Sequence, residues 1–118
     1  MPSLAAQYNF IADQGATFRR GLIKKDSYDR TVPLTGYTVR MQVRETYESA
    51  TTIFNLTVAS GNITIDAARG VITITITDED MTNVVPQEYV YDIELAYPTG
   101  EVERLLMGTF TVRNEVTR

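Results

Sequence analysis

The chain has 118 residues, a common size for a domain with one hydrophobic core, so we expect a single domain over residues 1–118. It contains neither histidine nor cysteine, and 11 Lys and Arg against 15 Asp and Glu give a formal net charge of −4. These features argue against histidine or thiol catalysis, transition-metal sites and nucleic-acid binding through phosphate contacts. No signal-peptide pattern opens the chain, and no apolar run approaches the roughly 20 residues needed to span a bilayer. We therefore expect synthesis in the cytoplasm and no membrane association.

Apolar and polar residues alternate with a period of two along most of the chain, which places successive side chains on opposite faces of a strand. Together with β-branched residues and intervening turn signals, this alternation predicts strands, in chain order, at residues 7–12, 17–25, 37–44, 53–58, 62–66, 71–77, 89–97 and 101–112. Strands with a single apolar face are typical of antiparallel sheets, because strands of a parallel sheet are apolar on both faces. In residues 37–44, for example, Val39, Met41 and Val43 share the inward face, whereas Gln42 and Arg44 share the solvent-facing one. The sequence thus predicts an all-β, antiparallel sandwich.

Two positions disturb the alternation. Gly21 interrupts the second predicted strand, and the pair Leu105 and Leu106 breaks the pattern in the last one. Glycine in a strand and a doubled apolar position are both signs of an extra residue, so we predict a bulge or bend at each place.

One short segment favours a helix. Residues 78–83 are predicted to form a helical turn, because Thr77 can cap it and the following carboxylates suit the positive end of the helix dipole. Tyr89 opens the next strand, and in immunoglobulin-like sandwiches a tyrosine at this place bonds back to the preceding corner. The expected fold is therefore an immunoglobulin-like β-sandwich of about 7–9 strands.

Charged clusters have simple structural interpretations. Asp78, Glu79 and Asp80 lack the alternating ligand spacing of a calcium loop, so we interpret them as charges at the start of the helix. The neighbouring pairs Arg19–Arg20 and Lys24–Lys25 should each divide between the two faces of a strand. We interpret these basic residues as solvated charges that protect a sheet edge, and not as a patch for an acidic partner.

The seven tyrosines raise the alternative of carbohydrate binding, in which exposed rings stack on sugars. Tyr37, Tyr89 and Tyr91 occupy inward positions of predicted strands, which favours packing for them. Tyr28 and Tyr47 lie in predicted loops and are the candidate exposed interaction residues.

No grouping typical of catalysis occurs in the sequence. A nucleophile with a base, a paired acid and base and a phosphate-cradling glycine loop are all missing at usable spacings. We therefore expect no enzyme activity, no catalytic, cofactor-binding or metal-binding residue, no cofactor and no small-molecule substrate.

Several segments together carry a resemblance to known proteins. They are QGATF at 14–18, PLTGYTVRMQVR at 33–44, GNITI at 61–65, GVIT at 70–73, YVYDIEL at 89–95, GTFTV at 108–112 and EVTR at 115–118. In this order they resemble a family of small proteins encoded among phage and prophage structural genes, and they are similar to the N-terminal module of phage upper-baseplate proteins. The loop 26–32 departs from the pattern: relatives place a glycine-containing hairpin turn there, whereas this chain has Ser27 to Arg30.

The resemblance implies an immunoglobulin-like domain that attaches to other virion structural proteins. The expected function is a structural component of a bacteriophage virion, located in the tail, baseplate or neck, with homo-oligomerisation inside the particle. The alternatives are a capsid decoration protein, or a carbohydrate- or receptor-binding module that would use Tyr28 and Tyr47.

Overall fold

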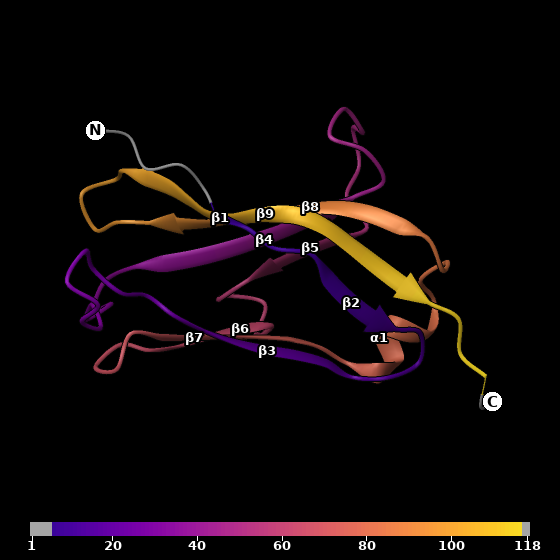
Figure 1. The fold of residues 1–118 in the computed structure, drawn as a ribbon, viewed down its shortest axis with the longest axis horizontal. Helices are drawn as coiled ribbons and strands as arrows, with labels where there is room; N and C mark the ends of the chain where they lie inside the picture. The colour runs from indigo at the N-terminus through magenta and orange to yellow at the C-terminus, as the bar shows by residue number, and fades with distance from the viewer. Residues whose placement is uncertain (1–5, 117–118) are drawn as a thin grey trace.

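The polypeptide forms two β-sheets that pack face to face in a body measuring 44 × 28 × 25 Å (Figure 1). A computed structural model describes residues 6–116. The larger sheet has the order β1 (Ala6–Gln7), β9 (Val102–Arg113), β8 (Glu88–Ala96), β4 (Thr38–Arg44) and β5 (Phe54–Thr57), and β2 (Phe10–Asp13) also pairs with β9. The smaller sheet has the order β3 (Phe18–Ile23), β7 (Val71–Ile76) and β6 (Ile63–Asp66).

The connections between the sheets identify the fold as an immunoglobulin-like β-sandwich. The chain passes from one sheet to the other between β2 and β3, β3 and β4, β5 and β6, and β7 and β8. The sheet β3-β7-β6 has the arrangement of strands B, E and D, and β9-β8-β4 has that of G, F and C. The predicted fold class is confirmed.

The first predicted strand is wrong in two respects, because residues 7–12 do not form a continuous strand and their pairing is parallel, whereas the sequence predicted an antiparallel sheet. β1 and β2 both run parallel to β9 but are separated at Tyr8 and Asn9. The Tyr8 carbonyl passes so close to Gly108 that a Cβ atom there would lie 2.2 Å from its oxygen. The Asn9 side chain replaces the missing ladder bond by accepting from the Thr109 backbone N–H at 3.1 Å.

Only one of the two predicted irregularities is present. The register between β8 and β9 shifts so that Ile93 lies opposite Leu106 and Glu94 lies opposite Arg104, which leaves Leu105 as the extra residue of a bulge. The bulge predicted at Gly21 is wrong, because β3 pairs with β7 in one unbroken register. Gly21 simply faces Thr73, and a Cβ atom at Gly21 would meet no atom within 4 Å.

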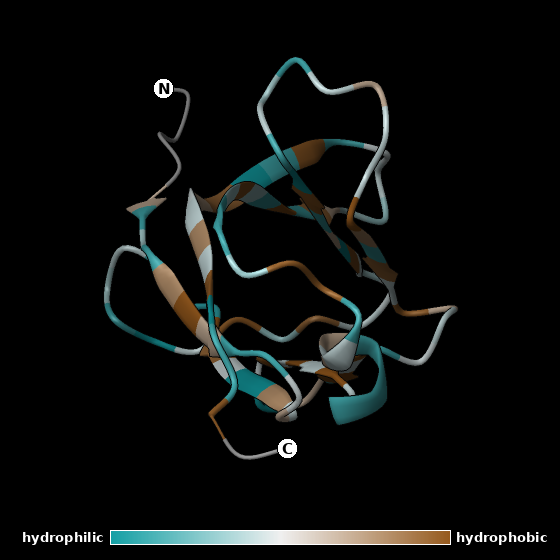
Figure 2. Ribbon diagram, turned by 90° about the vertical axis from the view of Figure 1, so that its right-hand side faces the viewer, coloured by the Kyte–Doolittle hydropathy of each residue, from teal (hydrophilic) through white to brown (hydrophobic). Residues whose placement is uncertain are grey.

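The core lies between the sheets and is built from the inward positions of the alternating strands. Figure 2 shows the resulting bands of hydrophobic and hydrophilic residues along the strands. Aromatic rings join the two sheets: Phe18 of β3 lies 5.4 Å from Phe10 of β2 and 5.0 Å from Phe110 of β9, between ring centroids. Tyr91 of β8 adds a further ring 5.0 Å from Phe10. Such contacts add about 0.5–1.5 kcal/mol each beyond the burial of area.

The predicted helix and tyrosine corner are both present. In α1 (Asp78–Thr82), the Thr77 hydroxyl caps the helix by accepting from the Asp80 N–H at 3.2 Å, while Met81 enters the core. The Tyr89 hydroxyl donates to the Val85 carbonyl at 2.5 Å, and the ring is buried. No helix within residues 6–116 has the length and apolar character needed to cross a membrane.

Candidate functional site

Tyr28 and Tyr47 are both exposed, as predicted for loop residues, but the fold does not bring them together. Tyr28 is 77% exposed and belongs to the loop that precedes β4, whereas Tyr47 is 59% exposed and follows β4. The loops therefore leave opposite ends of a seven-residue strand (Figure 1), about 20 Å apart at the usual rise per residue. The two tyrosines cannot belong to one small binding site.

Tyr28 lies at the tip of a turn that Asp26 organises. One carboxylate oxygen of Asp26 accepts from the N–H groups of Tyr28 and Arg30, at 2.9 and 3.0 Å. The hydrogen bond from the Arg30 N–H, followed by that from Tyr28, lowers the pKa of Asp26. Asp29 has a φ of +63°, so it adopts the left-handed conformation that a glycine-containing turn would normally supply. The Arg30 guanidinium lies 5.0 Å from the centre of the Tyr28 ring.

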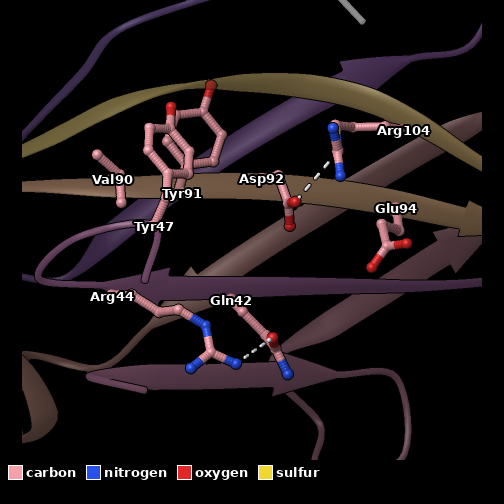
Figure 3. A pocket seen from close by; sticks show the side chains of 8 residues that line it. All are labelled: Gln42, Arg44, Tyr47, Val90, Tyr91, Asp92, Glu94 and Arg104. Carbon is pink, nitrogen blue, oxygen red and sulfur yellow. Dashed lines mark hydrogen bonds and ion pairs between the residues drawn. The ribbon is translucent and has the colours of Figure 1, made fainter. Parts of the chain in front are cut away.

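Tyr47 borders a hollow on the outer face of the larger sheet, which we call the outer-face cleft (Figure 3). Its volume is about 210 Å³. The ring of Tyr47 comes from the β4–β5 loop and extends across β8 in the view of Figure 3. The cleft is lined by residues of β4, β8, β9 and this loop: Gln42, Arg44, Tyr47, Val90, Tyr91, Asp92, Glu94 and Arg104.

The polar side chains of the outer-face cleft are held in place by one another. The Arg104 guanidinium lies 3.2 Å from an Asp92 carboxylate oxygen, and Arg44 donates to the Gln42 side chain at 3.1 Å. Arg44 also donates to the Ser49 carbonyl at 2.7 Å, which ties the β4–β5 loop to the sheet. Burial raises the pKa of Asp92, and the nearby Arg104 opposes that change. The cleft is thus a preorganised set of hydrogen-bonding groups.

A second hollow continues the outer-face cleft toward the other end of the sheet. An ion pair between Arg40 and Glu94, at 3.1 Å, lies between the two. The second hollow has a volume of about 370 Å³ and includes the apolar side chains of Val58, Ala96 and Val102. The outer face of the larger sheet therefore offers a trough with a polar half and a more apolar half.

Arg20 covers part of one lateral opening between the two sheets, where β3 of the smaller sheet lies opposite β2 of the larger sheet. We call this opening the open side of the sandwich. Its guanidinium donates to the backbone carbonyls of Ile11 on β2, at 3.1 Å, and of Arg19 on β3, at 2.9 Å. It also lies 4.5 Å from the centre of the Phe18 ring. Arg19 instead points outward and contacts Thr75 of β7 at 3.4 Å, so the pair divides between two faces as predicted. An inward-pointing charge of this kind protects a sheet edge.

Farther along β3 on this side lies a hollow of about 170 Å³, which we call the β3 groove. Its apolar lining comes from β3, β7 and β9: Leu22, Ile23, Ile72, Leu105 and Leu106. Lys24 also borders the groove and pairs with Glu103 at 3.3 Å.

The backbone of β3 is available beside this groove. The Lys24 N–H donates to the Gly70 carbonyl at 2.9 Å, in register with the β3–β7 ladder. Because bonded positions alternate in an antiparallel ladder, the N–H and C=O groups of Gly21 and Ile23 point away from β7. Within residues 6–116, β3 has no second strand neighbour.

The acidic cluster lies where the sequence interpretation placed it, at the start of a helix. Asp78, Glu79 and Asp80 form the first turn of α1. Among residues 6–116, no three side chains of the metal-binding types gather closely enough to hold an ion.

Of the residues that line the outer-face cleft, the sequence interpretation singled out Tyr47 alone. It assigned no interaction role to the other residues of the cleft or to those of the β3 groove. Alternation correctly placed Gln42 and Arg44 on the wet face of one strand, but Asp92 and Arg104 join them only through strand pairing. The opposite charges at outward positions of separate strands were the available signal.

No known protein family and no curated protein sequence matches the chain.

Proposed function

We propose that the chain is a structural subunit of a bacteriophage virion that attaches to other virion proteins in the tail, baseplate or neck. The segment resemblance to small phage structural proteins supports this assignment, and the immunoglobulin-like fold agrees with what that resemblance implies. The proposal includes several copies in each particle, since virion parts commonly assemble with symmetry.

The observation that carries the proposal is the free edge of β3 beside an apolar groove. Edge strands are normally covered or blocked, because their unpaired backbone groups accept foreign strands. Arg20 blocks only the part next to β2, whereas the backbone groups of Gly21 and Ile23 that point away from β7 have no partner strand within residues 6–116. A strand from a neighbouring subunit could pair with β3 and place an apolar side chain on Leu22 and Leu106.

The proposal assigns no catalysis and no cofactor to the chain. The absence of histidine and cysteine supports this, since these residues are the usual base, nucleophile and soft metal ligands. The polar groups of the outer-face cleft are instead paired with one another, as Asp92 is with Arg104.

Cryo-electron microscopy of virions from the phage that encodes the chain tests the assignment. We expect density for a two-sheet domain in the tail, baseplate or neck. Density on the capsid shell would favour a decoration protein, and absence of the chain from purified virions, checked by mass spectrometry, would refute the proposal.

Two matched variants test the mode of attachment. Ile23→Asp puts a charge at the β3 groove, where Ile23 is 56% exposed, and should reduce incorporation into particles. Ile11→Asp is the control, because Ile11 on β2 is 52% exposed and does not line the groove. Equal incorporation of both variants would show that another surface makes the contact.

A further inference from the structure

We propose that the outer-face cleft binds a neutral saccharide, with Tyr47 as the stacking platform. The proposal goes beyond virion assembly, because the cleft lies on the outer face of the larger sheet and the β3 groove lies on the open side of the sandwich. Its ligand would be a chain of neutral sugars, such as a surface polysaccharide.

The aromatic contribution comes from one side chain. Tyr47 is 59% exposed although it borders the cleft, so one part of its ring remains available for contact. The C–H face of a sugar ring is apolar and packs on an exposed aromatic ring, while the tyrosine hydroxyl can still form hydrogen bonds. The bond from Arg44 to the Ser49 carbonyl holds the loop that carries Tyr47, so little order is lost on binding.

The polar contribution suits hydroxyl groups. A guanidinium has five N–H donors and a carboxylate has about four acceptor sites, so the Arg104–Asp92 pair retains both kinds of capacity. The Gln42 amide and the Arg44 guanidinium add further planar groups on the neighbouring strand. Vicinal hydroxyls of a sugar both donate and accept, and they can use the two kinds of group at once.

The charge of the cleft favours a neutral ligand. Its lining contains two arginines, Arg44 and Arg104, and two carboxylates, Asp92 and Glu94. An anion or a cation would therefore meet as much repulsion as attraction, whereas a polyhydroxyl ligand needs only donors and acceptors.

The shape of the surface favours a chain over a single sugar. Beyond the Arg40–Glu94 ion pair, the second hollow presents Val58 and Val102. A following sugar unit could lay its apolar face there while its hydroxyl groups face solvent. The trough would then hold successive units across β4, β8 and β9.

Binding is tested on the whole chain by two probes. The first is an array of bacterial O-chains and capsular polysaccharides, and the second is nuclear magnetic resonance titration with methyl glycosides of glucose, galactose, rhamnose and N-acetylglucosamine at millimolar concentrations. We expect an array signal, together with chemical-shift changes at Gln42, Tyr47 and Asp92 for at least one glycoside.

Three variants sharpen the test. Tyr47→Ala and Asp92→Asn should each weaken saccharide binding by about tenfold or more, corresponding to roughly 1.4 kcal/mol. Tyr28→Ala is the matched control, since Tyr28 is also an exposed tyrosine but does not line the cleft, and its replacement should leave binding unchanged. The resonance spectrum of each variant reports whether its fold is kept.

Several results would overturn the proposal. They are the absence of binding in both experiments, unchanged binding by Tyr47→Ala, or chemical-shift changes confined to residues outside the cleft. A further result would also contradict the proposal: a virion protein binds this face, Tyr47→Ala abolishes that binding, and the glycosides have no effect. The ligand of the cleft would then be a protein and not a saccharide. Because the test uses the isolated chain, its failure is separate from a failure to enter particles.

Discussion

The Tyr91 hydroxyl donates a hydrogen bond to the backbone carbonyl of Tyr8 at 2.7 Å, across 83 positions of the sequence. This bond joins the centre of the larger sheet to the point where the first strand is interrupted. The Tyr91 ring is buried, and its burial raises the pKa of the hydroxyl. The neutral phenol therefore serves as a fixed donor for a carbonyl that has left the β-ladder.

Replacing Tyr91 by Phe should lower the free energy of unfolding by about 1 kcal/mol, because the Tyr8 carbonyl loses its donor. Urea unfolding should show a lower midpoint with an unchanged m-value, and amide exchange should become faster in residues 6–13. Tyr28→Phe serves as the control and should change stability by less than about 0.5 kcal/mol. Equal stability of Tyr91→Phe and the wild type would contradict this role.

Gly108→Ala should destabilise the domain by about 1–3 kcal/mol, the range for overpacked positions. A Cβ atom at Gly108 would lie 2.2 Å from the Tyr8 oxygen, so the first strand would have to move. Gly21→Ala should be neutral or stabilise by up to about 1 kcal/mol, since no atom lies within 4 Å of the added carbon. Thermal unfolding of the two variants measures the difference in stability. A similar effect at both glycines would contradict the close approach of the Tyr8 carbonyl to Gly108.

Arg20→Met should lower stability by about 1 kcal/mol and increase self-association. The variant loses two hydrogen bonds to backbone carbonyls, those of Ile11 and Arg19, and it uncovers the edges of both sheets. Light scattering after size-exclusion chromatography, compared with the wild type, measures the association. Arg19→Met is the control, because Arg19 is exposed and its side chain contacts Thr75 of β7, in the same sheet. An increase in association of the same size in Arg19→Met would show that edge protection is not the cause.

Stability should fall as the pH rises from 10 toward 12. A hydrogen bond to the Glu103 carboxylate, together with burial, raises the pKa of Tyr97 to about 12, and burial also raises the pKa of Tyr89. The folded chain therefore keeps these protons at a pH where the unfolded chain releases them. The contribution of the two protonated tyrosines to the free energy of unfolding is thus complete below pH 10 and is lost as the pH rises. Urea midpoints across this range measure the effect, and Tyr97→Phe should make the fall shallower. Midpoints that stay constant between pH 10 and 12 would contradict the prediction.

The sequence by itself determined the features that depend on local periodicity. Alternation identified the inward positions Val39, Met41 and Val43, and the broken pattern at Leu105 predicted the bulge in β9. The helix cap at Thr77 and the corner bond of Tyr89 were also predictable, because their partners lie within four positions along the chain. A side-chain period and a cap require no knowledge of distant segments.

The tertiary structure alone decided how distant strands meet. The break at Tyr8 depends on Gly108, and the closure by Arg20 depends on carbonyls of two different sheets. The outer-face cleft likewise depends on the register of β8 and β9, which places Arg104 opposite Glu94 and within 3.2 Å of the Asp92 carboxylate. Pairing between segments many residues apart leaves little trace in local periodicity, since the same alternation fits several partners. The sequence could therefore determine which face of each strand is wet, but only the packed sheets determine which side chains share it.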